Sequence, residues 1–264
     1  MQNSKIAWTD HTFNPWWGCV RVSPGCQHCY AETFAKRLGM PHLWGTRSNR
    51  RRMSASHWNQ PLKWNREAAN AQTPPRVFCA SMADVFEDHP DVGLDRVKLF
   101  ALIEMTPNLD WLLLTKRPEN IKRMLPLRWE VDVDDGGETP DNVWLMTTTE
   151  DQERFDARMP HIAHICAPVI GISVEPMLGP VELYHYQGAI DWVICGGESG
   201  PGARPMDIAW ARDLRDQCQA YHIPFFMKQM GSVYMREQGK PGKGEDLEDI
   251  PEDLRIREYP RWAD

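Results

Sequence analysis

Short apolar runs alternate with segments of helical periodicity along most of the chain from residue 77 onward. The apolar runs are residues 77–80, 111–114, 143–146, 169–172, 192–195 and 225–227, and the helical segments are residues 94–105, 153–164 and 207–221. Apolar runs that alternate with helices indicate parallel strands buried on both faces. A further strand region within residues 5–19 brings the expected number of strands to seven.

Two architectures fit this order of elements. One is a doubly wound open sheet, and the other is a TIM-like (β/α) barrel, complete or partial. Polar residues follow each predicted strand, and in a barrel these strand ends converge on the mouth where active sites lie. We therefore predict an α/β fold with a single TIM-like barrel domain over residues 1–264.

Two segments are expected to be peripheral to the barrel. Residues 40–76 form an insertion rich in Arg and Trp, and residues 237–264 form a charged tail that we expect to pack on the barrel. The insertion holds the strongest local positive charge of the chain, in Arg47, Arg50, Arg51 and Arg52. A guanidinium group binds phosphate oxygens well because its donors are planar and bidentate. Pairing with acidic neighbours is the alternative.

Composition limits the class of protein. The 264 residues are 42% apolar and 25% charged, which fits one core of barrel size. The net charge of −7 excludes a generally basic surface but allows a local nucleic-acid patch. Because the N-terminus is polar and no long apolar run occurs, we expect no signal peptide and no membrane span. Together with an odd number of cysteines, seven, this predicts reduced thiols in the cytoplasm.

Three of those cysteines, Cys19, Cys26 and Cys29, are close in sequence, and a turn at Ser23-Pro24-Gly25 separates the first from the second. A helix is predicted from Tyr30 to about Leu38. Three thiolates can hold a cubane iron–sulfur cluster and leave one iron open for a cofactor. A zinc site completed by His28 or a distant ligand, and a redox-active or structural Cys-x-x-Cys, are the alternatives.

The spacing of these cysteines resembles that of radical S-adenosylmethionine (SAM) enzymes, in a variant with six and then two intervening residues. The whole chain also resembles a phage-associated three-cysteine family of unassigned function. The motifs that carry this resemblance are Asn14-Pro15 beside Trp16, Ser23 to Glu32, Gly196 to Gly200, and Lys228 to Gly231.

The resemblance implies a barrel of the radical-SAM type with a [4Fe–4S] cluster on Cys19, Cys26 and Cys29. SAM on the open iron, reduced by an electron donor, would yield a 5′-deoxyadenosyl radical that abstracts hydrogen from a substrate. The substrate is expected to be a nucleotide or nucleic acid, which makes the protein a nucleic-acid-modifying enzyme. One alternative is a zinc- or iron-dependent nucleic-acid processing enzyme. The other is a non-catalytic nucleic-acid-binding protein in which the metal only stabilises the N-terminal loop.

Further site residues are predicted from their places after the strands. The residues that the resemblance assigns to the cofactor are Tyr30, Ser81, Asp84, Thr147, Thr149, Gly196, Gly197 and Glu198. Residues proposed to bind an anionic substrate are Arg50, Arg51, Lys116, Arg117 and Gln229. Glu175 and Lys228 are candidates for acid–base catalysis. The competing interpretation is that Glu175 and Glu198 form salt bridges with Lys116 and Lys228.

Overall fold

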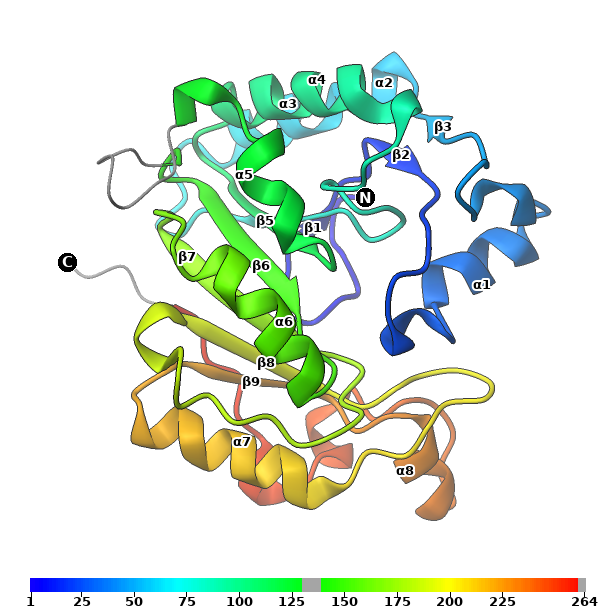
Figure 1. Cartoon of the computed structure of the whole chain (residues 1–264), viewed down its shortest axis with the longest axis vertical. Helices are drawn as coiled ribbons and strands as arrows, with labels where there is room; N and C mark the ends of the chain where they lie inside the picture. Colours follow the sequence, from blue (N-terminus) through cyan, green and yellow to red (C-terminus); the bar gives the residue numbers. More distant parts are fainter. Residues whose placement is uncertain (130–138, 261–264) are drawn as a thin grey trace. The chain divides into compact units, whose positions relative to one another are not determined.

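Parallel strands are the framework of the computed structural model, which describes residues 1–129 and 139–260. Within these ranges a seven-stranded sheet has the order β1-β4-β5-β6-β7-β8-β9, so sheet neighbours also follow one another along the chain (Figure 1). The strands are β1 (His11–Thr12), β4 (Arg76–Cys79), β5 (Asp110–Thr115), β6 (Val143–Thr148), β7 (Val169–Val174), β8 (Trp192–Gly196) and β9 (Phe225–Gln229). The seven predicted strands are confirmed, although the first covers only two residues of its predicted region.

Helices follow the strands as the periodicity predicted. The α-helices are α1 (Tyr30–Arg37), α2 (Ala55–Trp58), α3 (Gln60–Glu67), α4 (Gly93–Glu104), α5 (Ile121–Met124), α6 (Gln152–Ile162), α7 (Ile208–Ala220) and α8 (Ser232–Glu237). The short 3-10 helices are η1 (Pro24–Cys26), η2 (Pro41–Leu43), η3 (Pro90–Val92), η4 (Pro118–Asn120), η5 (Leu127–Trp129), η7 (Gln187–Ala189), η8 (Leu247–Asp249) and η9 (Glu252–Leu254). The four predicted helices correspond to α1, α4, α6 and α7, and aspartates cap the last two by accepting hydrogen bonds from backbone N–H groups.

Burial explains why the strands were visible in the sequence. Every residue of β6, β7 and β8 is buried, as expected for parallel strands covered on both faces. The pairs β1–β4, β4–β5, β7–β8 and β8–β9 are parallel. No helix in the described ranges is both long and apolar enough to cross a membrane.

The chain is divided into two compact units, which we describe one at a time. The first comprises residues 1–22, 31–145 and 164–168, and the second comprises residues 23–30, 146–163 and 169 onward. The assignment of residues 1–264 to a single domain stays a prediction.

Within the first unit, residues 40–76 contain regular secondary structure that was not predicted. They contain α2, α3 and β3 (Arg51–Arg52), which pairs antiparallel with β2 (Trp16–Trp17). Trp58 and Trp64 of this segment are 5% and 2% exposed, so they anchor its helices in the core.

Within the second unit, the tail after residue 237 contacts β9. The Glu258 N–H donates to Phe225 O at 2.9 Å, and the Met227 N–H donates to Ile256 O at 2.8 Å. The last part of the predicted tail, residues 261–264, lies outside the described residues.

Candidate functional site

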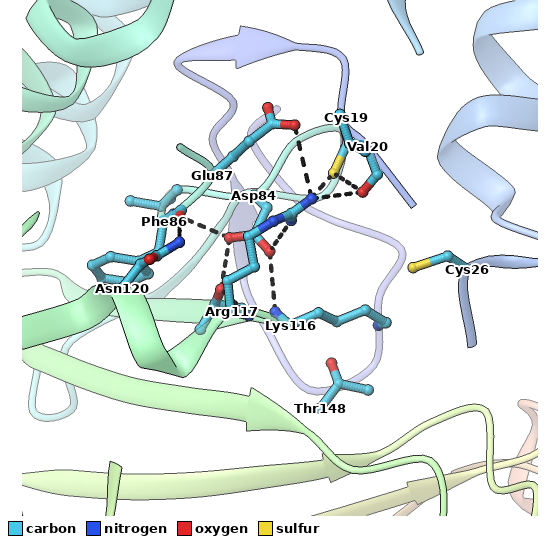
Figure 2. A network of polar contacts seen from close by, with 12 residues as sticks. Cys19, Val20, Cys26, Asp84, Phe86, Glu87, Lys116, Arg117, Asn120 and Thr148 are labelled. Carbon is cyan, nitrogen blue, oxygen red and sulfur yellow. Dashed lines mark hydrogen bonds and ion pairs between the residues drawn. The ribbon is translucent and has the colours of Figure 1, made fainter. Parts of the chain in front are cut away.

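The carboxylate of Asp84 follows β4 and binds the residues at the end of β5, all in the first unit (Figure 2). It accepts hydrogen bonds from Thr115 Oγ1 at 2.6 Å, the Lys116 backbone N at 3.0 Å and Arg117 Nη1 at 2.8 Å. Asp84 is only 5% exposed, so these bonds offset the loss of water around its charge. Asp84 and Arg117 thus bind each other here, and their predicted contacts with cofactor and substrate stay predictions.

Arg117 connects this network to the first cysteine. Its Nη1 lies 3.6 Å from Cys19 Sγ, and its Nη2 donates to Val20 O at 2.6 Å (Figure 2). Burial, and then the nearby charge of Asp84, raise the pKa of the Cys19 thiol to about 12, while Arg117 acts in the opposite direction. Because metals bind the thiolate, the guanidinium is the group in this network that favours the ligating form of Cys19.

A second buried arginine supports the same region. Arg50 Nε and Nη2 each donate to one oxygen of Glu87 at 2.8 Å, and neither side chain is more than 3% exposed. Glu87 also lies 3.8 Å from Arg117 Nη2. This bidentate pair indicates a structural role for Arg50, whereas its neighbour Arg51 is exposed.

Ser81, a predicted cofactor contact, belongs to the turn that follows β4. Asn14 Nδ2 donates to Ser81 Oγ at 3.1 Å, and Asn14 Oδ1 accepts from the Met82 N–H at 2.7 Å. The asparagine of the Asn14-Pro15 motif therefore holds the segment that leads to Asp84.

In the second unit, Cys26 and Cys29 lie on residues 23–30, which we call the cysteine loop. Ser23 Oγ donates to Glu150 Oε1, and the Glu150 side chain packs directly against Gly25. A Cβ at Gly25 would lie 2.3 Å from Glu150 Oε1, so only glycine fits this contact. Glu150 is 0% exposed, and its charge is paired with Arg158 Nη1 at 2.6 Å.

Glu198, from the Gly-Gly-Glu-Ser-Gly motif, holds the cysteine loop from a second position. It accepts from Arg204 Nη2 at 2.6 Å and Nε at 2.9 Å, and its Oε2 lies 3.1 Å from His28 Nδ1. Arg204 Nη2 also donates to Pro24 O at 3.0 Å. Burial alone would raise the pKa of Glu198, but the hydrogen bonds from Arg204 and His28 bring it below its ordinary value. Glu198 therefore remains an anion that fastens the loop.

The two glycines before Glu198 lie where β8 and β9 approach each other. A Cβ at Gly197 would lie 2.3 Å from the Met230 carbonyl oxygen, which makes glycine a packing requirement there. Gln229 Nε2 donates to Gly197 O at 2.8 Å. At the ends of β7 and β9, Lys228 Nζ donates to Glu175 Oε1, so the two candidate catalytic residues form an ion pair with each other. The predicted ligand contacts of these residues stay predictions.

Hydroxyl groups at the end of β6 differ in how they are satisfied. Thr147 and Thr149 are both 0% exposed. Among the described residues, Thr149 Oγ1 has no hydrogen-bond partner. A buried hydroxyl without a partner is costly and points to a ligand or water that would satisfy it. Tyr30, another predicted cofactor contact, is 53% exposed at the start of α1.

The chemistry of the three cysteines fits an iron–sulfur cluster. Cys19, Cys26 and Cys29 are half-buried cysteines, and thiolates are the usual ligands of such clusters. Cys19 belongs to the first unit and the other two belong to the second. In the described part of the chain, no group of three or more His, Cys, Asp or Glu side chains is arranged to hold a metal ion. The cluster and its shared ligation by all three cysteines therefore stay predictions.

From the sequence, no role was predicted for four charged residues of these networks. They are Glu87, Glu150, Arg158 and Arg204. Glu150 directly follows the three threonines at the end of β6, so its place after a strand was an available signal. No comparable signal marks Arg158, which projects from α6, or Arg204, which lies between Ala203 and Pro205 in a loop.

Two solved structures have a similar fold. One is a mutant spore photoproduct lyase with bound AdoMet and dinucleoside spore photoproduct, with a TM-score of 0.51 and 13% identity over 83% of this chain and 75% of that chain. The other is spore photoproduct lyase complexed with dinucleoside spore photoproduct, with a TM-score of 0.50 and 12% identity over the same shares. This likeness confirms the predicted α/β fold of a partial TIM-like barrel, and it supports the resemblance to radical SAM proteins.

Sequence comparison gives the family. No curated protein matches the chain. A family model described as "protein of unknown function (DUF5131)" matches residues 3–253, which is nearly the whole chain. The chain therefore belongs to the DUF5131 family.

Proposed function

We propose that this protein is a radical-SAM-like iron–sulfur enzyme that acts on a nucleotide or nucleic acid. The observation that supports the proposal is a set of three cysteines after the first strand of a fold shared with spore photoproduct lyase. Cys19, Cys26 and Cys29 would hold a [4Fe–4S] cluster. Such a cluster, reduced by an external one-electron donor, would supply the electron for cleavage of SAM into methionine and a 5′-deoxyadenosyl radical.

The chain's own residues supply position and charge. Arg117 donates toward the Cys19 sulfur, while Glu150 and Glu198 fasten the cysteine loop. These charges are buried, so the segments that carry the ligands are held before any cofactor arrives. The unsatisfied hydroxyl of Thr149 is the group that we assign to contact with the cofactor.

Glu175 and Lys228 are the pair that we propose to face the substrate. Their ion pair places the Lys228 Nζ donor next to the Glu175 carboxylate. Both side chains are mostly buried, at 17% and 14% exposed, so water competes little for their hydrogen bond.

The experiment is anaerobic reconstitution with iron and sulfide, followed by SAM and dithionite. We expect a brown protein with about four irons per chain that forms 5′-deoxyadenosine. The triple variant of Cys19, Cys26 and Cys29 to Ala is the matched control and should bind no cluster. An intact cluster without SAM cleavage would overturn the proposal, as would a colourless protein with stoichiometric zinc.

A further inference from the structure

Aromatic and basic side chains gather around the antiparallel β2–β3 pair in the first unit. The Arg51 guanidinium lies over the Trp17 ring at 5.0 Å, and the Trp17 ring lies 6.0 Å from that of Phe34 on α1. Phe34 is 46% exposed, so its ring offers a free apolar face to a ligand. This ring contact joins β2 to α1.

Three consecutive arginines, Arg50, Arg51 and Arg52, differ in their partners. Arg50 is buried against Glu87, and Arg52 is paired with Asp95 at 3.0 Å. Arg51 makes no ion pair with any residue that the structure describes, and its Nη1 lies 3.3 Å from Met40 Sδ. The charge of Arg51 is therefore available to an external anion, whereas those of its two neighbours are neutralised.

Two further exposed arginines lie on α1 and on the loop that precedes Arg50. Arg37 follows Phe34 by three residues, which places both on the same face of α1. Arg47 lies on the loop that Arg50 holds, because Arg50 Nη2 donates to Gly45 O at 3.2 Å and its Nη1 donates to Ser48 O. Within the described ranges neither Arg37 nor Arg47 forms an ion pair. Unpaired arginines gathered on a chain of net charge −7 mark a surface for an anionic partner.

The geometry indicates the kind of anion. An indole ring beneath a guanidinium fixes its plane and leaves its N–H edge free for phosphate oxygens. An exposed phenyl ring next to it can stack a base, which is how proteins bind single strands without reading their sequence. An acidic peptide would use the arginines but would leave the Phe34 ring without a partner.

We propose that Trp17, Phe34, Arg37, Arg47 and Arg51 form a docking surface for single-stranded nucleic acid. This inference deepens the proposed function and rests on it, because it places the substrate strand beside the segment that carries Cys19. Trp17 precedes Cys19 by two residues, and the Gly18 N–H between them donates to Met82 O at 3.0 Å. A strand on this surface therefore lies next to a fixed segment of the site.

Binding is tested on the metal-free protein with fluorescent single-stranded oligonucleotides, by anisotropy at several salt concentrations. We expect a log–log salt slope of about −2 for three phosphate contacts. Arg51→Ala should weaken binding about tenfold and reduce the slope by about one. Phe34→Ala should weaken binding at least fivefold with the slope unchanged, since stacking contributes about 1–3 kcal/mol per base.

Arg52→Ala is the matched control, since it removes the same charge from the next residue but from an arginine that is already paired. It should change the affinity less than twofold, and thermal unfolding should show that all three variants fold. Equal losses in Arg51→Ala and Arg52→Ala would overturn the docking surface. So would tighter binding of duplex than of single strands, equal binding of polyglutamate, or no binding. None of these outcomes affects 5′-deoxyadenosine formation without substrate, so the two proposals fail separately.

Discussion

The cysteines of the predicted cluster are held in two different ways. In the first unit, a buried cation reaches the sulfur itself, because Arg117 Nη1 lies 3.6 Å from Cys19 Sγ. In the second unit, Arg204 donates to Pro24 O, Gln27 Oε1 and the carboxylate of Glu198, and so holds the loop that carries Cys26 and Cys29.

This difference separates electrostatic control from mechanical control. A charge next to a sulfur changes the stability of its thiolate, whereas a charge that binds the backbone fixes where the sulfur lies. We therefore expect changes at Arg117 to act on Cys19 and on the stability of the first unit. Changes around Glu150 and Glu198 should instead act on the position and accessibility of Cys26 and Cys29.

Arg117→Ala should have the largest effect. It leaves the buried carboxylate of Asp84 without its cation, and removal of one partner from a buried ion pair costs about 3–5 kcal/mol. The free energy of unfolding from denaturant titration should fall by about 3 kcal/mol, because Thr115 and the backbone still donate to Asp84.

The control for this change is Arg123→Ala. Arg123 pairs with the exposed Asp88 at 3.0 Å, so its loss should change the unfolding free energy by less than about 1 kcal/mol. If both variants lose the same small amount, the Asp84–Arg117 network does not stabilise the first unit.

Gly25→Ala tests the mechanical side of the comparison. Its Cβ would meet Glu150 Oε1 at 2.3 Å, and Glu150 is fully buried, so the loop or the carboxylate must shift. We expect a loss of about 1–3 kcal/mol in stability and faster alkylation of Cys26, measured by mass spectrometry. Gly188→Ala, where no atom lies within 4 Å of the added carbon, should change neither quantity.

Glu198→Gln should loosen the cysteine loop where Arg204 and His28 hold it. The amide keeps the size of the carboxylate but loses the charge-assisted bonds to Arg204, at a cost of about 1–2 kcal/mol. Alkylation of Cys26 and Cys29 in the metal-free protein should accelerate severalfold while that of Cys19 stays unchanged. Equal acceleration at all three cysteines would show general destabilisation and would remove the distinction between the two regions.

The sequence allowed the framework to be predicted because the framework depends on local patterns. Strands buried on both faces are continuous apolar runs. Helices such as α4 and α7 separate one run from the next along the chain. The helices of residues 55–67 were not predicted. Pro61 lies in the first turn of α3, where proline fits.

Much of the candidate site could not be predicted because its contacts link residues far apart in sequence. Ser23 and Glu150 are 127 positions apart, and Pro24 and Arg204 are 180 apart. These residues meet only because the chain folds, and local patterns in a single sequence do not show which distant residues will meet. The motif around Glu198 was recognised, but Gly197 is required by its packing against Met230. The functions of these residues toward a cofactor stay predictions.

The smallest effect concerns how the hold of Glu198 depends on pH. Burial alone would raise the pKa of Glu198, but the hydrogen bonds from Arg204 and His28 hold it below its ordinary value in the folded protein. A lowered carboxyl pKa stabilises the fold above the unfolded value, and this contribution is lost as the pH falls through the folded pKa. The stability gap between the wild type and Glu198→Gln should therefore be full at neutral pH and shrink as the pH falls below about 4. Denaturant titrations of both proteins at several pH values measure this gap. If the gap does not change with pH, Glu198 acts through its shape and not through its charge. The charge of Glu198 would then not contribute to holding the cysteine loop in the second unit.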